Sequence, residues 1–476
     1  MKMKYISVIL LLVGINCSCS GWLDVKPSDR ISEETAFSTV AGFEEALNGI
    51  YVELNSDALY GRSLSCEFVE MLAQRYAIAE ESKSNYAIAD FEYDGSVAKS
   101  KIQSIWQKAY NLIANANLLL RNCELHREVL TDDYYHLCKG EALALRGMLH
   151  FDLFRLFGPV YGRDSVATSI PYYKEFALEV NPSLSGVAFM QSVIDDLTQA
   201  ENELENDPII TYGIAGNPKN SFFQYRHLRL NYYAIQALLA RVWMYRGVND
   251  KAMEYAQKVI GIHETLFPWV DDLAVGGNGN IPDRMFSSEL LFSLQHLNRN
   301  SIFTSLFDAQ NLKLQTSLLI PRWDVVREVF RQNQSDYRYK YFLSSSADFA
   351  GVNYAVFDRY QGQDSLYNQM IPMLRISEMY MIAAEVAEKK EEALEYLNIL
   401  RNNRGLRALP EGYYSQVDSY LEEEWLRELY GEGQLFFYYK RKMKTEIRSA
   451  YDPYGTKKIS TYKYVLPVPD GETQYN

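Results

Sequence analysis

The 476-residue chain carries 61 acidic and 48 basic side chains, which gives a formal net charge of -13 at pH 7. A surface of this charge repels nucleic acid and anionic lipid headgroups. The composition therefore argues against a role in binding phosphate groups and predicts no nucleic-acid partner. Tyrosine is unusually abundant, with 37 residues against 22 Phe and 6 Trp. Because a tyrosine combines a flat apolar ring with a polar tip, this composition suits wet surfaces that hold partly apolar ligands.

Residues 1–18 have the pattern of a secretory signal peptide. Lys2 and Lys4 precede an apolar run over residues 5–15, which is too short to span a bilayer as a stable helix. A bacterial lipoprotein is cut just before a cysteine that becomes acylated, and Ser18 supplies the small residue required before Cys19. We therefore predict that acyl chains on Cys19 are the only membrane attachment. An ordinary signal peptide that happens to contain cysteines is the alternative.

Apolar periodicity predicts helices through much of the first half of the mature chain. Ser32 is placed to cap a first helix whose apolar face runs to Leu54. Residues 55–100 mix polar and aromatic side chains and are interpreted mostly as loop. The helical period returns over residues 101–120, and a partner helix follows over residues 138–156 until a Gly-Pro pair stops it.

Two predicted helix pairs have the sequence features of tetratricopeptide-type hairpins. In the first, residues 230–245 and 252–260 carry facing apolar stripes rich in alanine, joined by a turn that contains Gly247. In the second, residues 379–387 face residues 393–400. Because the pairs do not repeat in tandem at a period of about 34 residues, they do not predict a regular solenoid. We predict an all-α fold in which tetratricopeptide-type hairpins form a frame.

Long irregular insertions are predicted between Phe267 and Gln369. Residues 276–279 are glycine-rich, residues 344–346 are all serine, and apolar alternation is poor throughout. Aromatic side chains are nevertheless concentrated in this region. Since loops on a rigid frame are where binding residues gather, we expect these insertions to carry the ligand face.

The sequence offers no recognisable catalytic, metal or cofactor site. Its six histidines never form an i,i+4 pair, no phosphate loop or G-x-S-x-G elbow occurs, and 61 carboxylates guarantee accidental acidic pairs. We therefore predict no enzyme activity, no cofactor and no metal. Cys66, Cys123 and Cys138 are too scattered for a disulfide scaffold, and whether two of them form a bridge stays open.

One acidic stretch, residues 422–432, invites an enzymatic interpretation. Glu428 and Glu432 are expected on one helix face with Arg427 beside them, and an arginine can clamp a carboxylate through two hydrogen bonds. No nucleophile or metal ligand lies nearby in the sequence. We therefore interpret these charges as partners that satisfy one another where the helix meets its neighbours.

Several segments, in family order, resemble the SusD/RagB family of outer-membrane lipoproteins of the Bacteroidetes. Each segment is weakly specific alone, but together they span nearly the whole mature chain. They are Cys19 to Pro27, Gly42 to Tyr51, Ala144 to Arg146, Leu156 to Val160, Leu374 to Tyr380, Leu397 to Arg401, Arg427-Glu428, Glu432-Gly433 and Tyr464 to Pro469.

The resemblance implies an all-α fold and a lipid anchor in the outer membrane, with the protein facing the cell exterior. It also implies a lid-like association with a TonB-dependent transporter of the SusC type, to which the protein delivers oligosaccharides. We expect a signal peptide (1–18), an N-terminal SusD-like part (19–225) and a C-terminal RagB/SusD-like part (226–476) that forms one compact unit with it. Relatives are expected to carry an acidic pair where this chain has residues 71–76. Because the ligand loops vary most across such a family, no particular sugar can be transferred.

Two functions of other classes stay open beside oligosaccharide binding. One is a helical scaffold lipoprotein that binds peptide or protein through its helix pairs. The other is an all-α glycoside hydrolase, which needs only two carboxylates at the right separation.

The ligand site is predicted from two aromatic-rich irregular stretches, residues 74–93 and residues 303–323. In members of the family that the chain resembles, the corresponding regions form the ligand face. The predicted stacking platforms are Tyr76, Tyr86, Tyr93, Phe303 and Trp323, and the predicted polar partners are Gln74, Arg75 and Asn85.

Overall fold

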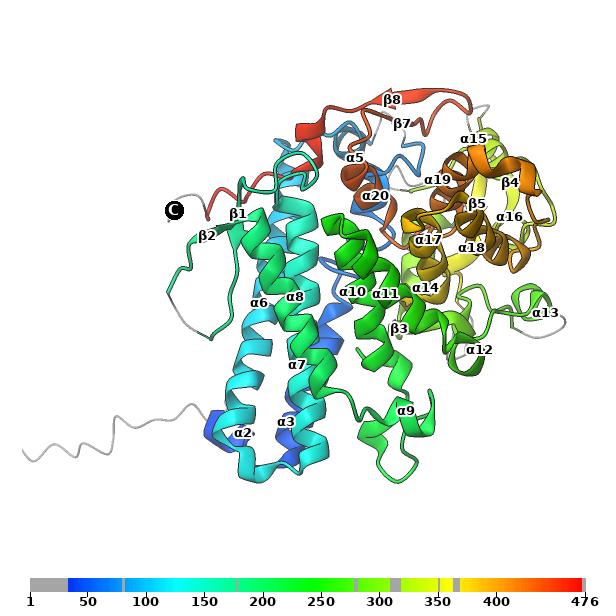
Figure 1. The fold of residues 1–476 in the computed structure, drawn as a ribbon. Helices are drawn as coiled ribbons and strands as arrows, with labels where there is room; N and C mark the ends of the chain where they lie inside the picture. Colours follow the sequence, from blue (N-terminus) through cyan, green and yellow to red (C-terminus); the bar gives the residue numbers. More distant parts are fainter. Residues whose placement is uncertain are drawn as a thin grey trace, which may run out of the picture.

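The computed structural model describes residues 33–78, 82–176, 179–277, 281–308, 318–349, 352–362 and 369–472. The predicted signal peptide, the anchor at Cys19 and the cap at Ser32 lie outside these residues. Within them the chain is mostly helical with a few short strands, which confirms the all-α prediction (Figure 1). None of the described helices combines the length and the hydropathy that crossing a bilayer requires.

The helices and strands have the following bounds. The helices of the first half are α2 (Glu33–Ala36), α3 (Val40–Leu54), α4 (Phe68–Leu72), α5 (Lys83–Ala89), α6 (Ser96–Leu125), α7 (Asp132–Phe157), α8 (Gly186–Glu203), α9 (Pro208–Tyr212) and α10 (Tyr232–Arg246). Those of the second half are α11 (Asn249–Ile260), α12 (His263–Leu266), α13 (Asp272–Gly276), α14 (Arg299–Ile302), α15 (Trp323–Val329), α16 (Tyr337–Phe342), α17 (Ile376–Val386), α18 (Lys390–Asn402), α19 (Val417–Arg427) and α20 (Leu435–Arg441). The strands are β1 (Thr168–Pro171), β2 (Ser183–Ser185), β3 (Leu290–Gln295), β4 (Leu343–Phe349), β5 (Val352–Phe357), β6 (Met370–Arg375), β7 (Glu446–Arg448) and β8 (Thr456–Lys458).

The long helices form a continuous row in which each packs on the next. The order is α6, α7, α8, α10, α11, α17 and α18 (Figure 1). Helix α7 is buried along most of its length because it lies between α6 and α8 and also contacts α3. Its glycines allow this close packing, since a Cβ on Gly140 would lie 2.6 Å from Cγ of Leu204 and one on Gly147 would lie 3.0 Å from Cδ2 of Leu197.

The two predicted helix pairs, α10 with α11 and α17 with α18, are present and lie side by side because α11 packs on α17. Asn231 caps the N-terminus of α10, where its Oδ1 accepts hydrogen bonds from the backbone N–H groups of Tyr233 and Ala234, each at 3.0 Å. Gly247 ends α10 with a φ of 81°, a conformation that glycine adopts without steric conflict. The tetratricopeptide character of the pairs stays a prediction.

The N-terminal region differs from the prediction in two places. The single helix predicted up to Leu54 is two helices, α2 and α3, because Thr39 starts a new helix by accepting the N–H of Gly42 at 3.3 Å. Residues 55–100, interpreted as loop, contain α4, α5 and the first turn of α6. Helices as short as α4 and α5 show no apolar period, and each is followed by a left-handed residue, Gln74 (φ 59°) and Phe91 (φ 61°).

Within the part of the chain that the structure describes, four antiparallel two-stranded sheets join segments of the frame: β1–β2, β3–β6, β4–β5 and β7–β8. Strands β3 and β6 pair on either side of much of the predicted insertion, with Gln295 opposite Met370. The N–H of His296 then donates to the carbonyl oxygen of Gln369 at 2.5 Å. The two ends of the segment between these strands, residues 296–369, therefore lie next to each other at the helical frame. The segment is less irregular than predicted, because it holds β4, β5 and short helices.

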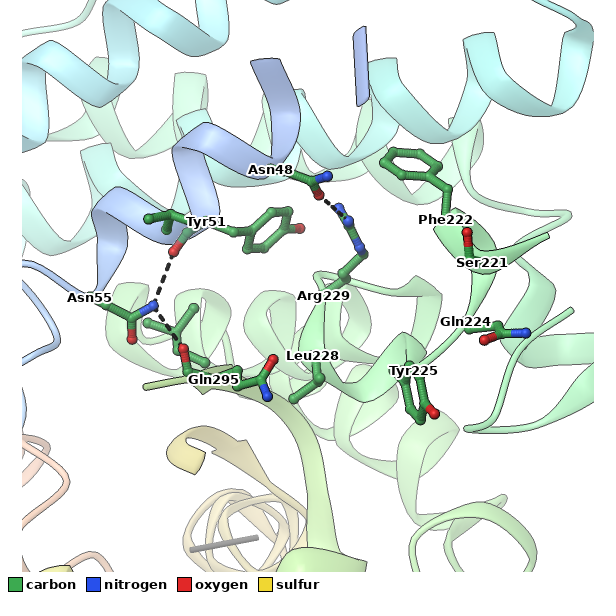
Figure 2. Close-up of a pocket in the computed structure, with 12 residues that line it drawn as sticks. Asn48, Tyr51, Asn55, Ser221, Phe222, Gln224, Tyr225, Leu228, Arg229 and Gln295 are labelled. Carbon is green, nitrogen blue, oxygen red and sulfur yellow. Dashed lines mark hydrogen bonds between the residues drawn. The ribbon is translucent and has the colours of Figure 1, made fainter. Parts of the chain in front are cut away.

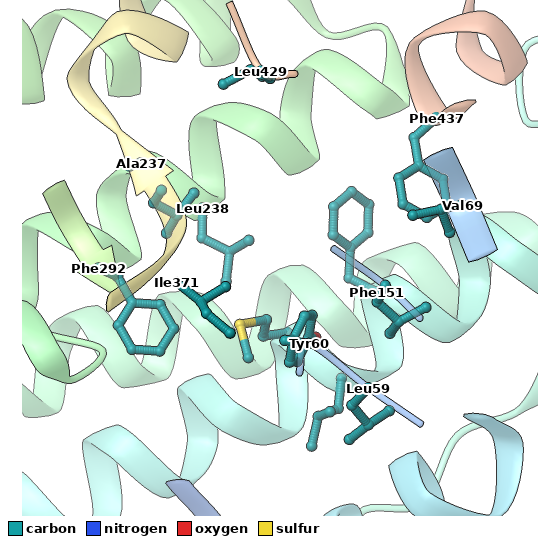
Figure 3. Close-up of a cluster of buried hydrophobic side chains, with 14 of the residues drawn as sticks. Leu59, Tyr60, Val69, Phe151, Ala237, Leu238, Phe292, Ile371, Leu429 and Phe437 are labelled. Atoms are coloured by element: carbon teal, nitrogen blue, oxygen red, sulfur yellow. The ribbon is translucent and has the colours of Figure 1, made fainter. Parts of the chain in front are cut away.

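One hydrophobic core extends through both halves of the chain. Figure 3 shows Leu59, Phe151, Leu238, Ile371 and Phe437 among the side chains that pack together in it. These residues come from segments that are far apart in the sequence. The N-terminal and C-terminal halves therefore share their interior, while the boundary between residues 225 and 226 stays a prediction.

The three cysteines that the structure describes, Cys66, Cys123 and Cys138, are buried free thiols. The bridge that the sequence left open is therefore not formed among them. Burial raises the pKa of Cys66 and of Cys123 to about 12, so these thiols stay protonated and unreactive at neutral pH.

A network of buried guanidinium and carboxylate groups joins the elements of the C-terminal half. Glu428 accepts hydrogen bonds from Arg338 at 2.8 Å, from Arg375 at 2.6 Å and from Arg404 at 2.6 Å. Glu289 binds Arg404 as well, at 2.6 Å. Burial alone would raise the pKa of Glu428, but the charges of Arg404, Arg375 and Arg338 hold it well below its usual range.

The network confirms the structural interpretation of residues 422–432 and corrects one detail. Helix α19 ends at Arg427, so Glu428 and Glu432 lie in the following turn instead of on one helix face. Glu432 pairs with Arg359 at 2.6 Å and with Arg375 at 2.8 Å. Each carboxylate is therefore bound by arginines from other segments, as a structural role requires.

We expect Glu428→Gln to lower the free energy of unfolding by roughly 3–5 kcal/mol, because the amide leaves buried guanidinium groups without a counter-charge. Glu422→Gln is the matched control. Its carboxylate lies 2.7 Å from Lys444, with the two side chains 38% and 29% exposed, so the loss should stay within about 1 kcal/mol. Urea unfolding followed by circular dichroism measures both variants. Similar small losses in the two would contradict the role of the network.

A mostly buried carboxylate outside this network, Glu385 of α17 with its side chain 10% exposed, links the frame to α20. Arg441 donates to its two oxygens at 2.5 and 2.8 Å, and Lys442 donates at 3.1 Å. Burial alone would raise the pKa of Glu385, but the charge and hydrogen bonds of Arg441 outweigh burial and lower that pKa to about 2.

The folded-state pKa of Glu385 is below the unfolded value of about 4.3, so the ionised pair stabilises the fold above that pH and this contribution disappears as the pH falls toward 2. We expect the stability difference between wild type and Glu385→Gln to shrink by about 3 kcal/mol between about pH 5 and about pH 2. Urea titrations at a series of pH values measure it. A difference that does not change with pH would show that the carboxylate is not ionised by its partners.

Candidate ligand-binding face

The two aromatic-rich stretches predicted to form the ligand site meet in the fold. The backbone N–H of Ala77 donates to the carbonyl oxygen of Ile320 at 3.1 Å. The rings of Tyr76 and Phe307 lie 5.9 Å apart. Much of this contact is made in the interior, so the exposure of each predicted residue decides whether it can reach a ligand.

Three of the predicted stacking platforms are buried. Tyr76, Tyr93 and Phe303 are 1%, 8% and 7% exposed. The hydroxyl of Tyr76 donates to the carbonyl oxygen of Cys66 at 2.8 Å, and that of Tyr93 donates to the carbonyl oxygen of Lys463 at 2.7 Å. These rings therefore pack in the core, which corrects the prediction that they stack on a ligand.

Two of the predicted polar partners are also buried, with Gln74 and Arg75 each 5% exposed. Nε2 of Gln74 donates to the carbonyl oxygen of Ala89 at 2.6 Å. Nε of Arg75 donates to Glu70 at 3.1 Å, and its guanidinium group lies 4.3 Å from the ring centre of Tyr430. Both side chains are engaged inside the fold, so the structure does not support them as ligand contacts.

Three predicted residues reach the surface. Tyr86 of α5 is 37% exposed, and Asn85 beside it is half-buried. Trp323, the first residue of α15, is half-buried, and its ring stacks on that of Tyr339 at 6.0 Å with 26° between the planes. Their role as ligand contacts stays a prediction.

Tyr451, in the turn between β7 and β8, extends the exposed aromatic surface beside α5. Its ring lies 6.3 Å from that of Tyr86. Its hydroxyl accepts the N–H of Ile78 at 3.2 Å and donates to the carbonyl oxygen of the same residue at 3.0 Å. Burial raises the pKa of Tyr451 to about 12, so the hydroxyl keeps its proton and the ring is held in place.

Arg322 and its neighbours bring a charged pair to the same region. Arg322 pairs through its backbone with Tyr354 of β5. Its Nε and Nη2 donate to the carboxylate of Asp324 at 2.9 and 2.5 Å. The hydrogen bonds to Asp324 raise the pKa of Arg322, to which Tyr354 and Asp452 also contribute. Asp452 follows Tyr451, so these groups lie beside the tyrosines of α5 and β7–β8.

We call the set of partly exposed residues Tyr86, Tyr354, Tyr451, Arg322 and Trp323 the aromatic face, in which Trp323 is included because it directly follows Arg322. It is built on α5, α15, β5 and the β7–β8 turn. Rings of this kind stack on the C–H faces of a ligand, while a guanidinium group donates and a carboxylate accepts hydrogen bonds at its polar rim. Among the described residues, no group of three His, Cys, Asp or Glu side chains is placed to hold a metal ion.

Sequence reasoning missed Tyr451 and Arg322. Residues 451–455 read Tyr-Asp-Pro-Tyr-Gly, a tyrosine-rich turn signal that could have been added to the candidate loops. Nothing local indicated that this turn would lie against α5, because the contact joins opposite ends of the chain.

Family models match most of the chain. Residues 21–212 match a SusD-like model described as "Starch-binding associating with outer membrane", and residues 331–476 match the model of the SusD family. The curated SusD-like protein P2 of Formosa agariphila is 23% identical over 271 residues, which cover 54% of this chain and 46% of the relative. SusD-like protein P38 of the same organism is 27% identical over 209 residues, covering 43% and 38%. This chain thus aligns with less than half the length of either relative.

Solved structures share the fold over nearly the whole chain. A SusD superfamily protein from Bacteroides thetaiotaomicron superposes with a TM-score of 0.72 at 20% identity, covering 92% of this chain and 98% of that chain. A SusD-like carbohydrate binding protein from Bacteroides vulgatus superposes with a TM-score of 0.70 at 19% identity, covering 92% and 96%. With the two family models and the shared fold, the chain belongs to the SusD/RagB family.

Proposed function

We propose that this protein is a cell-surface lipoprotein that binds oligosaccharides at the aromatic face and passes them to a TonB-dependent transporter of the SusC type. The observation that carries the proposal is family membership. The model matched by residues 21–212 is described as starch-binding and outer-membrane-associated. A solved structure with the same fold is called a carbohydrate binding protein.

The aromatic face suits a neutral glycan. A pyranose ring presents an apolar C–H face, which stacks on an aromatic ring, and a rim of hydroxyls, which both donate and accept hydrogen bonds. Tyr86 and Trp323 supply rings, and the Arg322–Asp324 pair supplies a donor and an acceptor in one place. Contacts of this kind bind a ligand without breaking a bond, so the proposal is for a binding protein.

Delivery to a transporter requires the protein to stay at the outer membrane. Acyl chains on Cys19 supply that attachment, because each buried methylene contributes about 0.8 kcal/mol of membrane affinity. In this proposal the anchor at Cys19 precedes the folded unit, which lies on the outer side of the membrane as the family resemblance implies. The transporter is the expected partner, and it would receive the cargo from the aromatic face.

We expect Tyr86→Ala and Trp323→Ala to weaken glycan binding about tenfold or more, since stacking on one ring contributes about 1–3 kcal/mol. Isothermal titration calorimetry with a panel of neutral oligosaccharides measures the affinities. Tyr212→Ala is the matched control, because Tyr212 is 50% exposed on α9, away from α5 and α15 (Figure 1). Unchanged affinity in both test variants, with the thermal midpoint of each preserved, would contradict the aromatic face as the site.

The same titrations separate the alternatives. A binder leaves the length of an oligosaccharide unchanged, whereas a glycoside hydrolase shortens it. Reducing ends that appear at an enzymatic rate would replace the proposal by the hydrolase alternative. Binding of peptides, with no oligosaccharide bound, would favour the scaffold alternative.

We expect Cys19→Ala to release the protein from the outer membrane, because the acyl acceptor is lost while the signal peptide remains. Cys17→Ala is the matched control and should stay membrane-bound. Membrane fractionation with a radioactive fatty-acid label measures both. A Cys19→Ala protein that still sediments with the outer membrane, together with an unlabelled wild type, would show that the chain is not lipidated at this residue.

A further inference from the structure

A polar cleft opens between α3, the 3-10 turns Ser221–Phe223 and Arg226–Leu228, and the end of β3 (Figure 2). Its volume is about 280 Å³. That is just below the range of ligand pockets, which span roughly 300–1,000 Å³, so the cleft suits a small ligand. The cleft shares no lining residue and no element with the aromatic face, so it is a separate place on the molecule.

The walls of the cleft are held in position before any ligand arrives. Nδ2 of Asn55 donates to the carbonyl oxygens of Tyr51 at 3.3 Å and of Gln295 at 3.1 Å, which joins α3 to β3. The guanidinium group of Arg229 lies 5.1 Å from the ring centre of Tyr51 and 4.6 Å from that of Phe222. Figure 2 shows these side chains around one opening. A preformed site loses little conformational freedom on binding.

The charges beneath the cleft cancel. Arg229 lies 3.4 Å from Glu141, which Arg226 binds at 2.7 Å and the hydroxyl of Tyr51 at 2.7 Å. Arg226 in turn pairs with Asp207 at 2.7 Å. Two guanidinium groups therefore face two carboxylates, so a charged ligand would find no unpaired counter-charge in this set.

The remaining polar groups of the lining are neutral. Amide side chains both donate and accept hydrogen bonds, as sugar hydroxyls do, so the two match in either orientation. Beside Arg229, the polar side chains that line the cleft are Asn48, Tyr51, Asn55, Ser221, Gln224, Tyr225 and Gln295.

Tyr225 lines the cleft in an unusual backbone conformation. Its φ is 51°, in the left-handed region that non-glycine residues rarely adopt, and its N–H donates to the carbonyl oxygen of Ala215 at 3.0 Å. Its side chain is nevertheless 53% exposed. The exposed ring of Tyr225 at the edge of the cleft is therefore held by a fixed backbone conformation and is accessible to a ligand.

We propose that this cleft is a second sugar-binding site, which takes one or two units of a neutral saccharide. The sugar would stack on Tyr225 while Gln224 and Gln295 bind its hydroxyls, and Asn48, whose Oδ1 already accepts from Arg229, would donate through its Nδ2. The choice of a saccharide rests on the proposed function, whereas the place and the neutrality of the ligand rest on the cleft. Two sites on one molecule would hold a long glycan at two points and raise its effective affinity by multivalency.

The test uses the mature full-length chain with the aromatic face disabled by Tyr86→Ala and Trp323→Ala together. Calorimetry with maltotriose, cellotriose and mannotriose should find binding of at least one trisaccharide that survives in this double variant. Adding Tyr225→Gly should weaken that remaining binding at least tenfold, because glycine keeps the left-handed backbone while removing the ring. Met443→Gly is the matched control, since Met443 is also left-handed (φ 50°) and 41% exposed but lies outside the cleft.

The outcomes separate this inference from the proposed function. Binding to wild type that vanishes completely in the double variant overturns the second site and leaves the aromatic face in place. Remaining binding that Tyr225→Gly does not weaken also overturns it. No binding of any trisaccharide to wild type overturns both. If Tyr225→Gly does not fold, Tyr225→Asn replaces it, because asparagine tolerates the left-handed region.

Discussion

The buried carboxylate of Glu428 fixes how the C-terminal half assembles. A buried charge is tolerated only when it is paired and hydrogen-bonded, so Glu428 requires Arg338 of α16, Arg375 of β6 and Arg404 after α18 to arrive together. None of these elements can move alone without leaving a charge unpaired in the interior. Packing of apolar side chains would accept small shifts of the same elements, whereas this network accepts one arrangement. The insertion that carries α16 is thereby tied to the helical frame.

The turn that follows Glu428 transmits the same constraint to the N-terminal half. The N–H of Gly433 donates to Glu70 at 2.9 Å, and the hydroxyl of Tyr430 donates to the carbonyl oxygen of Arg75 at 3.0 Å. Gly433 has a φ of 71°, and a Cβ there would lie 2.0 Å from the carbonyl oxygen of Leu64, so only glycine fits. Two residues after Arg75, the N–H of Ala77 donates to the carbonyl oxygen of Ile320. The segments around the aromatic face are therefore placed by the interior and not by their own loops.

The sequence predicts long amphipathic helices well, because an apolar stripe reports burial directly, as in α10, α11, α17 and α18. Prediction from the sequence fails for side chains that are buried by contacts with residues far away in the chain. Tyr93 looked like a surface ring, yet its hydroxyl finds the carbonyl oxygen of Lys463 across 370 residues, and no local pattern signals such a partner. Tyr86 of α5 and Trp323 of α15 do reach the surface, and their role as ligand contacts stays a prediction. Tyr451 was missed for the same reason that Tyr93 was misplaced, since only the folded chain brings β7 and β8 to α5.

The pairing of β3 with β6 allows the segment between the two strands to change in sequence and length independently of the helical frame. Because Gln295 lies opposite Met370, this segment begins and ends at one closed base, and its length can change without moving either strand. Closing a longer loop is cheap, at about 0.6 kcal/mol for each doubling of its length. Related proteins could therefore differ in this segment, and in the ligands that it selects, while the helical frame stays the same. Such an exchange would have to preserve Arg338, because its loss would leave Glu424 and Glu428 short of a partner, and Arg359, which pairs with Glu432.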